Sequence, residues 1–168
     1  MVEARDRRRI VMRIDTATVA DAGTLAELNE HVHRLHLEHA PAFFSEPTRE
    51  AAAAAFGVLL ARDDTRAFIA SVDDDAVGYV LVVTYERPAS AFSPARRTLY
   101  IDQIAVAPGA RRRGVGRELV GAALGWARAA SINDIEVDTW AFNTAAQAFF
   151  TSFGFRAKTG RLWVKLQD

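Results

Sequence analysis

The chain has 168 residues, half of them apolar and a quarter charged, which is the composition of a folded globular domain rather than of an extended disordered region. The 21 basic residues (Lys and Arg) equal the 21 acidic ones, and this neutrality argues against nucleic-acid-binding and membrane-surface proteins, because both need a basic excess. Cysteine is absent, which excludes disulfides, a thiolate nucleophile and a cysteine metal site, and is compatible with the cytoplasm, where we expect the protein.

The predicted elements follow from apolar spacing. Helices are expected where apolar residues recur every three or four positions, and strands where apolar and β-branched residues run together. We expect a flexible N-terminal tail over residues 1–9 and a single α/β domain with a mixed sheet over residues 10–168. In chain order the expected elements are a strand at 10–16, a helix from Thr18 or Asp21 to Pro41, a helix at 48–61, strands at 67–72, 77–84 and 99–106, a helix at 116–131, a strand at 135–140, a helix at 144–152, and one or two strands within 156–166.

The segment from Val106 to Gly116 carries the clearest chemical signal. A predicted strand runs into a glycine-containing loop, and a predicted helix starts directly after it. The first N–H groups of that helix lack intrahelical partners, and the helix dipole adds positive potential beside the three arginines Arg111, Arg112 and Arg113. Gly114 and Gly116 let the backbone approach a ligand closely. The pattern predicts a cradle for an anion, most simply a pyrophosphate.

Two common phosphate-binding loops do not fit this segment. Gly109 and Gly114 have the spacing of a P-loop, but Val115 and Gly116 stand where that loop requires Lys and then Ser or Thr. A dinucleotide-binding loop that begins at Gly114 would need Gly or Ala at position 119, which is Leu119. Nucleoside triphosphates and dinucleotides are therefore disfavoured as ligands.

The loop instead resembles the pyrophosphate loop of the GNAT acetyltransferases, a Gln/Arg-x-x-Gly-x-Gly/Ala pattern in which Arg111, Gly114 and Gly116 fill the fixed positions. Residues 100–108 resemble the strand that precedes this loop in the family, and residues 143–155 resemble a later helix that ends in a Gly-Phe pair. These motifs lie in register over residues 98–155, so the chain resembles a GNAT acetyltransferase.

The resemblance implies a fold and a cosubstrate. The implied fold is the acyl-CoA N-acyltransferase fold, with a central mixed, twisted sheet of about six to seven strands flanked by about four helices. The implied cosubstrate is acetyl-CoA. Backbone groups of Ile104, Ala105 and Val106 would bind its pantetheine arm. Backbone N–H groups of the loop would hold its pyrophosphate, and these belong to Arg112, Arg113, Gly114, Val115, Gly116 and Arg117.

Two further positions come from the later motif. Asn143 matches a position that commonly bonds the cofactor arm, and its sequence context equally suits a helix N-cap. Phe150 stands where many family members have a Tyr that is proposed to protonate the leaving thiolate. Since a CoA thiol resembles a cysteine thiol, with a pKa of roughly 8.5, the thiolate can leave without an acid near neutral pH.

The implied chemistry requires a base, because an alkyl amine has a pKa of about 10 and arrives protonated. Asp102 is the first candidate, since it lies in an otherwise apolar strand, where burial would raise its pKa towards neutrality and make it a stronger base. Glu86 is the second candidate. The Val106 N–H is the candidate donor to the carbonyl oxygen of the acyl group.

The four histidines, His31, His33, His36 and His39, do not share one helical face and lack His-x-x-x-His spacing, so no metal is expected. His36 or His39 is expected to line the acceptor pocket. No apolar run reaches the roughly 20 residues that span a bilayer, so we expect no membrane partner.

The leading functional hypothesis is an acetyl-CoA-dependent N-acetyltransferase that acts on a primary amine of a small molecule. A protein amine is a second substrate class for the same chemistry. A different class of function is a non-catalytic acyl-CoA sensor of the same fold, and a third is a module whose arginine loop binds another anion. Homodimers are common in the family, so a second copy of the chain is the expected protein partner.

Overall fold

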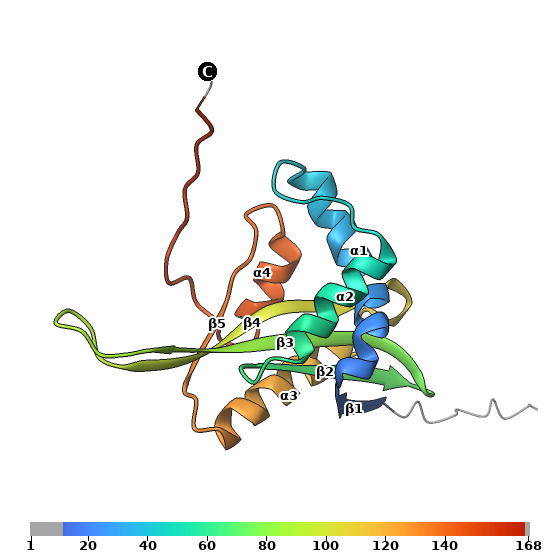
Figure 1. The fold of residues 1–168 in the computed structure, drawn as a ribbon, viewed down its shortest axis with the longest axis horizontal. Coiled ribbons are helices and arrows are strands. Elements are labelled where there is room, and N and C mark those ends of the chain that lie inside the picture. The colour runs from blue at the N-terminus through green and yellow to red at the C-terminus, as the bar shows by residue number, and fades with distance from the viewer. Residues whose placement is uncertain (1–11, 167–168) are drawn as a thin grey trace, which may run out of the picture. The chain divides into compact units, whose positions relative to one another are not determined.

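The computed structural model describes residues 12–166, so the tail expected at residues 1–9 lies outside the described residues. Figure 1 shows the elements along the chain. They are β1 (Met12–Thr16), the 3-10 helix η1 (Val19–Asp21), α1 (Ala22–His39), α2 (Arg49–Leu60), β2 (Thr65–Val72), β3 (Asp75–Arg87), β4 (Arg96–Val106), the 3-10 helix η2 (Pro108–Ala110), α3 (Val115–Ala129), β5 (Asp134–Val137) and α4 (Thr144–Thr151).

The strands form one mixed sheet in the order β1-β2-β3-β4-β5. The first four strands pair antiparallel, and β5 runs parallel to β4. The prediction of six to seven strands was wrong, because the described chain contributes five. The missing strands were expected at 156–166, which contains no strand. Alternating apolar residues show that a segment can pair, but a strand also needs a neighbour with which to form a ladder.

The chain divides into two compact units, one ending at Val137 and one beginning at Asp138. In the first unit, α1 and α2 lie over one face of the sheet and α3 lies over the other (Figure 1). The core between the sheet and the two N-terminal helices is a cluster of buried apolar side chains. It comprises Leu25, Ala26, Leu28, Phe56, Ala67, Ile69, Tyr79, Leu81, Val83 and Ala105.

Local sequence explains where the helices of this unit begin. Thr48 caps α2, because its hydroxyl oxygen accepts a hydrogen bond from Ala51 N–H at 3.1 Å. Thr18 and Asp21 form a capping box around η1, which leads directly into α1. Both caps coincide with the predicted helix starts.

The second unit contains α4, whose N-cap is Asn143. The side-chain oxygen of Asn143 accepts a hydrogen bond from Ala146 N–H at 3.1 Å, so the N-cap alternative for this residue is confirmed. Phe150 is buried, and its ring packs edge-on against Phe149 and Phe155. Gly154 has a φ of 89°, the left-handed conformation that favours glycine after a helix.

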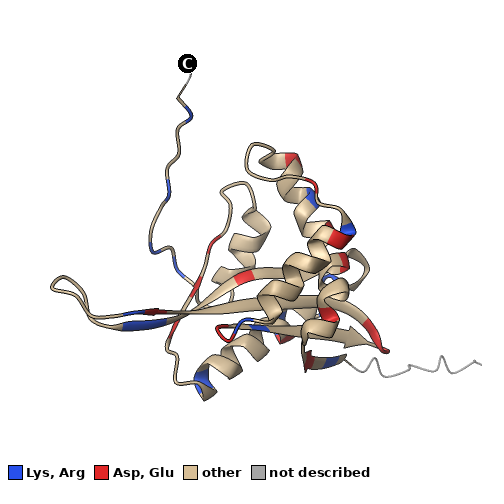
Figure 2. Cartoon of the chain, viewed as in Figure 1, with Lys and Arg blue, Asp and Glu red and all other residues tan. Residues whose placement is uncertain are grey.

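The chain has equal numbers of basic and acidic residues, and Figure 2 shows both kinds interspersed along the elements. Within residues 12–166, no helix combines the length and the apolar character that crossing a bilayer requires.

Candidate active site

A β-bulge places Asp102 at an irregular point of the central strand β4. Gln103 pairs with Leu81 of β3, whereas Ile101 pairs with the next residue, Val82, so Asp102 is the extra residue between the two pairs. Bulges bend a strand and redirect the side chain of the extra residue. The Asp102 side chain is exposed, in contrast to Ile101 before it, which is buried. The burial expected for Asp102 is therefore wrong, because the bulge turns the carboxylate towards solvent.

Beyond the bulge, none of the strands within residues 12–166 pairs with β4 on the side opposite β3. The ladder between β4 and β5 ends at the pair Ile101–Val137, while the ladder between β4 and β3 continues to Val106. We call the side of residues 102–106 that faces away from β3 the open edge. Ala107 N–H donates to Val77 O of β3 at 2.8 Å. Since backbone groups alternate along a strand, the N–H groups of Ile104 and Val106 point to the open edge.

The arginine loop, residues 107–114, leads from the open edge into α3. The first backbone bond of α3 runs from Glu118 N–H to Gly114 O at 3.1 Å, so the amides that precede Glu118 at the helix start have no intrahelical acceptor. Gly114 has a φ of 86°, and Arg112 has a φ of 62°, which is uncommon for a side chain with a Cβ. Such backbone strain clusters at ligand-binding loops.

The three arginines of this loop differ in role. Arg111 Nε donates to Val106 O at 3.0 Å and so fastens the loop to the end of β4. The side chains of Arg112 and Arg113 are exposed. The start of α3 therefore combines amides without intrahelical acceptors, a helix dipole and nearby positive charge, and each of these favours a negatively charged ligand. Val115, buried beneath the loop, anchors it to the core.

Glu86 lies elsewhere. It is paired with Arg97 across β3 and β4, and Arg97 Nε contacts its carboxylate at 3.1 Å. Val106 lies nine positions after Arg97 on β4, which corresponds to about 30 Å of extended strand. Asp102, the open edge and the arginine loop follow one another along β4, whereas Glu86 lies near the far end of the β3–β4 hairpin.

A group of polar side chains that the sequence analysis missed lies beside Asp102. Asn29 of α1 donates through Nδ2 to the Tyr79 hydroxyl at 2.6 Å and to Gln103 Oε1 at 3.0 Å. The Tyr79 hydroxyl also donates to Gln103 Oε1 at 2.8 Å, and Gln103 Nε2 donates to Asp102 Oδ2 at 3.3 Å. The available signal was Asn29 itself, a polar residue four positions after the buried Leu25 and therefore on the apolar face of its helix.

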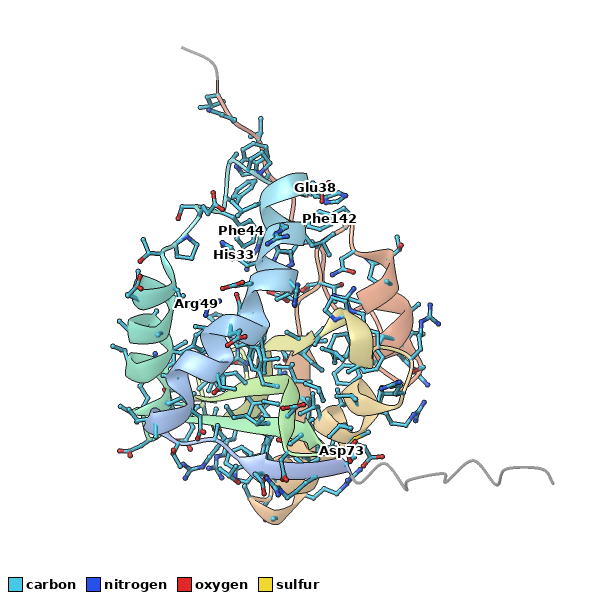
Figure 3. All side chains as sticks on the ribbon, turned by 90° about the vertical axis from the view of Figure 1, so that its right-hand side faces the viewer. His33, Glu38, Phe44, Arg49, Asp73 and Phe142 are labelled. Carbon is cyan, nitrogen blue, oxygen red and sulfur yellow. The ribbon has the colours of Figure 1, made fainter. Side chains whose placement is uncertain are left out.

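Two histidines of α1 flank Phe44, which follows that helix. His36 stacks on the Phe44 ring at a centroid distance of 4.9 Å, and His33 meets the same ring edge-on at 5.8 Å. Figure 3 shows His33 beside Phe44. His33 Nε2 also bonds Ser45 O at 2.7 Å. His33 and His36 therefore share a neighbour although the sequence analysis placed them on different faces, because three residues nearly complete a helical turn.

The titration of His36 predicts a pH effect on stability. Burial, and secondarily the nearby His33, lower the pKa of His36 below its ordinary value of 6.5. As the pH falls below 6.5, His36 takes up a proton more readily in the unfolded chain than in the folded one. The free energy of unfolding therefore decreases as the pH falls below 6.5. We expect His36→Phe, which keeps a stacked ring, to flatten the decline between pH 7 and about 5. Denaturant melts across this range measure the effect. Exposed His31→Gln is the control, and an unchanged decline in His36→Phe would contradict the assignment.

Metal ligands do not cluster in the described chain. Among residues 12–166, no three His, Asp or Glu side chains are grouped as metal ligands would be. The chemistry available on β4 is that of a carboxylate, backbone amides and an anion site.

Comparisons with solved structures show the fold. The structure resembles a tetramutant of the BH1408 protein from Bacillus halodurans (TM-score 0.85, 24% identity, 92% of this chain and 99% of that one). It also resembles the aminoglycoside N-acetyltransferase AAC(6')-Iy in complex with CoA (TM-score 0.70, 22% identity, 96% and 99%). A third similar structure is a ribosomal-protein-alanine N-acetyltransferase from Brucella melitensis biovar Abortus 2308 (TM-score 0.71, 17% identity, 94% and 100%).

No curated protein matches the chain by sequence. The sequence profile of the Acetyltransferase (GNAT) family, however, matches residues 29–155, which include the second part of α1, the open edge, the arginine loop and α4. Because this match covers most of the chain, the protein belongs to the GNAT family of acetyltransferases.

Proposed function

We propose that the protein transfers an acetyl group from acetyl-CoA to a primary amine of a small molecule by direct attack of the amine. One observation carries the proposal: Asp102 and the arginine loop lie at opposite ends of the same open edge, separated by about 13 Å of strand. A proton acceptor and the arginine loop are thus joined by a stretch of backbone in which the N–H groups of Ile104 and Val106 point away from β3. The family match runs across both compact units, so we infer that they form one acetyltransferase domain.

The residues present fit acetyl-CoA, which supplies the acetyl group as a thioester. Backbone N–H groups of Ile104 and Val106 would bind its extended arm as a neighbouring strand does. The amides from Arg112 to Arg117 would bind its pyrophosphate. Val106 N–H is the proposed donor to the acyl oxygen as that oxygen gains charge. One similar structure contains CoA, and another contains a bisubstrate analogue that joins CoA to an acetylated neamine.

Asp102 is the proposed general base. Its exposed carboxylate is accessible to a cationic amine and attracts it by charge, and it accepts the proton that the amine must lose before attack. Glu86, held by Arg97 near the hairpin end, has no part in this proposal. Phe150 supplies no proton, so the thiolate leaves without an acid from this position.

Ligand-dependent melting tests the cofactor site. We expect acetyl-CoA and CoA, but not ATP, to raise the melting temperature, with about 2.7 kcal/mol gained at 100 times the dissociation constant. Gly114→Ala should reduce this gain, since it forces a side chain into the left-handed conformation at the loop. Gly154→Ala is the matched control, with the same backbone cost outside the loop.

An amine panel scored by thiol release then tests the reaction. Release that depends on both acetyl-CoA and an amine supports an acetyltransferase. Binding without turnover on small amines and on peptides with free amines would support the sensor alternative instead. If neither coenzyme stabilises the protein at millimolar concentration, the cofactor assignment is wrong.

A further inference from the structure

Three polar side chains from three elements form a closed hydrogen-bonded group behind Asp102. We call Asn29 of α1, Tyr79 of β3 and Gln103 of β4 the relay, because each member contacts the other two. Tyr79 is fully buried in the core between the sheet and the two N-terminal helices. A buried hydroxyl in an apolar core is costly unless it is bonded, and here it both donates and accepts.

The charge of Asp102 fixes the orientation of the whole relay. An ionised carboxylate only accepts hydrogen bonds, so the Gln103 atom that faces Asp102 must be the amide nitrogen. The Gln103 oxygen then faces inward, where it accepts from Tyr79 and from Asn29. If both amides were turned around, a carbonyl oxygen would face the carboxylate, which repulsion disfavours.

Tyr79 keeps its proton at any working pH. Burial raises the pKa of its hydroxyl well above the usual range, and the negative charge of Asp102 raises it further, whereas the bond from Asn29 lowers it. The hydroxyl is therefore a permanent donor to Gln103 Oε1. Arg62 is a nearby positive charge that interacts electrostatically with Asp102. Its hydrogen-bond partner is Asp64, which its guanidinium contacts at 2.6 Å and 2.9 Å.

We propose, on the basis of the proposed function, that Asn29, Tyr79 and Gln103 are positioning residues. They hold the Asp102 carboxylate in the orientation in which it accepts a proton. They also couple the charge of Asp102 to the orientation of the Asn29 side chain on α1. The last bond of the relay, from Gln103 Nε2 to Asp102 Oδ2, holds the carboxylate in one orientation. When Asp102 takes up a proton, it no longer requires a donor in front of it, and the amide of Gln103 is free to turn. Proton uptake by Asp102 thereby changes the hydrogen bonds of Asn29 on α1.

Side-chain amide NMR tests this coupling without any need for turnover. In the ¹⁵N-labelled protein, with Gln103 assigned through Gln103→Met, the NH₂ signals of Gln103 and Asn29 should move together as the pH is lowered. Asp102→Asn should abolish the common movement, while Asp63→Asn, an exposed carboxylate of the α2–β2 turn, should leave it intact. Signals that stay fixed with pH, or that move equally in Asp102→Asn, would overturn the proposal.

Kinetics provide the second arm. Gln103→Glu removes the donor and adds a negative charge beside Asp102, and neighbouring carboxylates disfavour each other's charged form. The acid limb of kcat/KM should therefore shift up by about one pH unit. Gln103→Met should give a smaller shift in the same direction. Exposed Asn133→Asp, the same chemical change outside the site, is the control.

The variant Tyr79→Phe distinguishes a loss of positioning from a loss of folding, because it keeps the buried ring and removes only the hydroxyl. It should lower kcat several-fold with the KM for acetyl-CoA unchanged, whereas Tyr85→Phe, on the same strand, should match the wild type. A Gln103→Glu profile that overlays an active wild type would overturn the relay and leave the proposed function standing. A wild type that acetylates no amine would instead overturn the proposed function, and the NMR arm alone would then decide the relay.

Discussion

Asp102→Asn should lower kcat/KM for any accepted amine by about 10²- to 10⁴-fold near neutral pH, the usual contribution of a general base. Asparagine has the same shape and can still accept the hydrogen bond from Gln103 Nε2, but it cannot take a proton from the amine. The deficit should shrink as the pH rises towards about 10, because an increasing fraction of the amine is then already deprotonated. Initial rates of thiol release between pH 6 and 10 measure both effects.

The same variant should keep its fold and its cofactor. Asp102 is exposed, so its replacement leaves the core unchanged, and the gain in melting temperature with acetyl-CoA should equal that of the wild type. Asp63→Asn, also exposed, should behave as the wild type in both assays. An Asp102→Asn variant that retains full activity at pH 7 would exclude this carboxylate as the base and would direct attention to water.

Gly78→Ala should produce the largest loss of stability among single small substitutions in the sheet. A Cβ at Gly78 would lie 2.8 Å from Ala105 O and 3.2 Å from Val115 Cγ1 and Leu119 Cδ1. The first of these is backbone and cannot turn aside, so β4 or α3 must move. We expect a cost of about 1–3 kcal/mol, as for other overpacked sites, and a drop in melting temperature of about 3–10 °C.

This substitution should also weaken cofactor binding. Ala105 precedes Val106 on the open edge, and Val115 follows Gly114 of the arginine loop, so either displacement alters the proposed site. Gly121→Ala on α3 is the matched control, since nothing lies within 4 Å of its added Cβ, and it should stabilise the helix by up to about 1 kcal/mol. If Gly78→Ala melts like the wild type, the close packing of β3 against β4 and α3 is wrong.

The sequence was sufficient for the features that depend on local rules. Thr48 followed by an alanine-rich run predicts a capped helix, and the Asp-rich turn between two apolar runs predicts the β2–β3 hairpin. The arginine loop was predicted because its glycine spacing and its position between a strand and a helix are visible in the sequence alone.

The features that depend on partners were not predictable in the same way. The bulge at Asp102 is a property of the register between two strands, and the order of residues in β4 does not reveal it. The relay joins residues 50 and 74 positions apart, which no local pattern connects. The prediction of strands within 156–166 was wrong for a related reason. A suitable sequence does not by itself supply a second strand with which to pair.

The open edge has a consequence for how the protein behaves at high concentration. Unpaired strand edges are templates on which other chains add and aggregate, so folded proteins blunt them with bulges, with charge or by keeping them short. This edge has all three properties: it spans only residues 102–106, it is kinked by the bulge at Asp102, and it ends beside Arg112 and Arg113. The geometry that leaves room for the narrow arm of a small molecule thus makes the edge a poor template for a second polypeptide. An edge with these three properties therefore adds little to the tendency of the folded protein to aggregate.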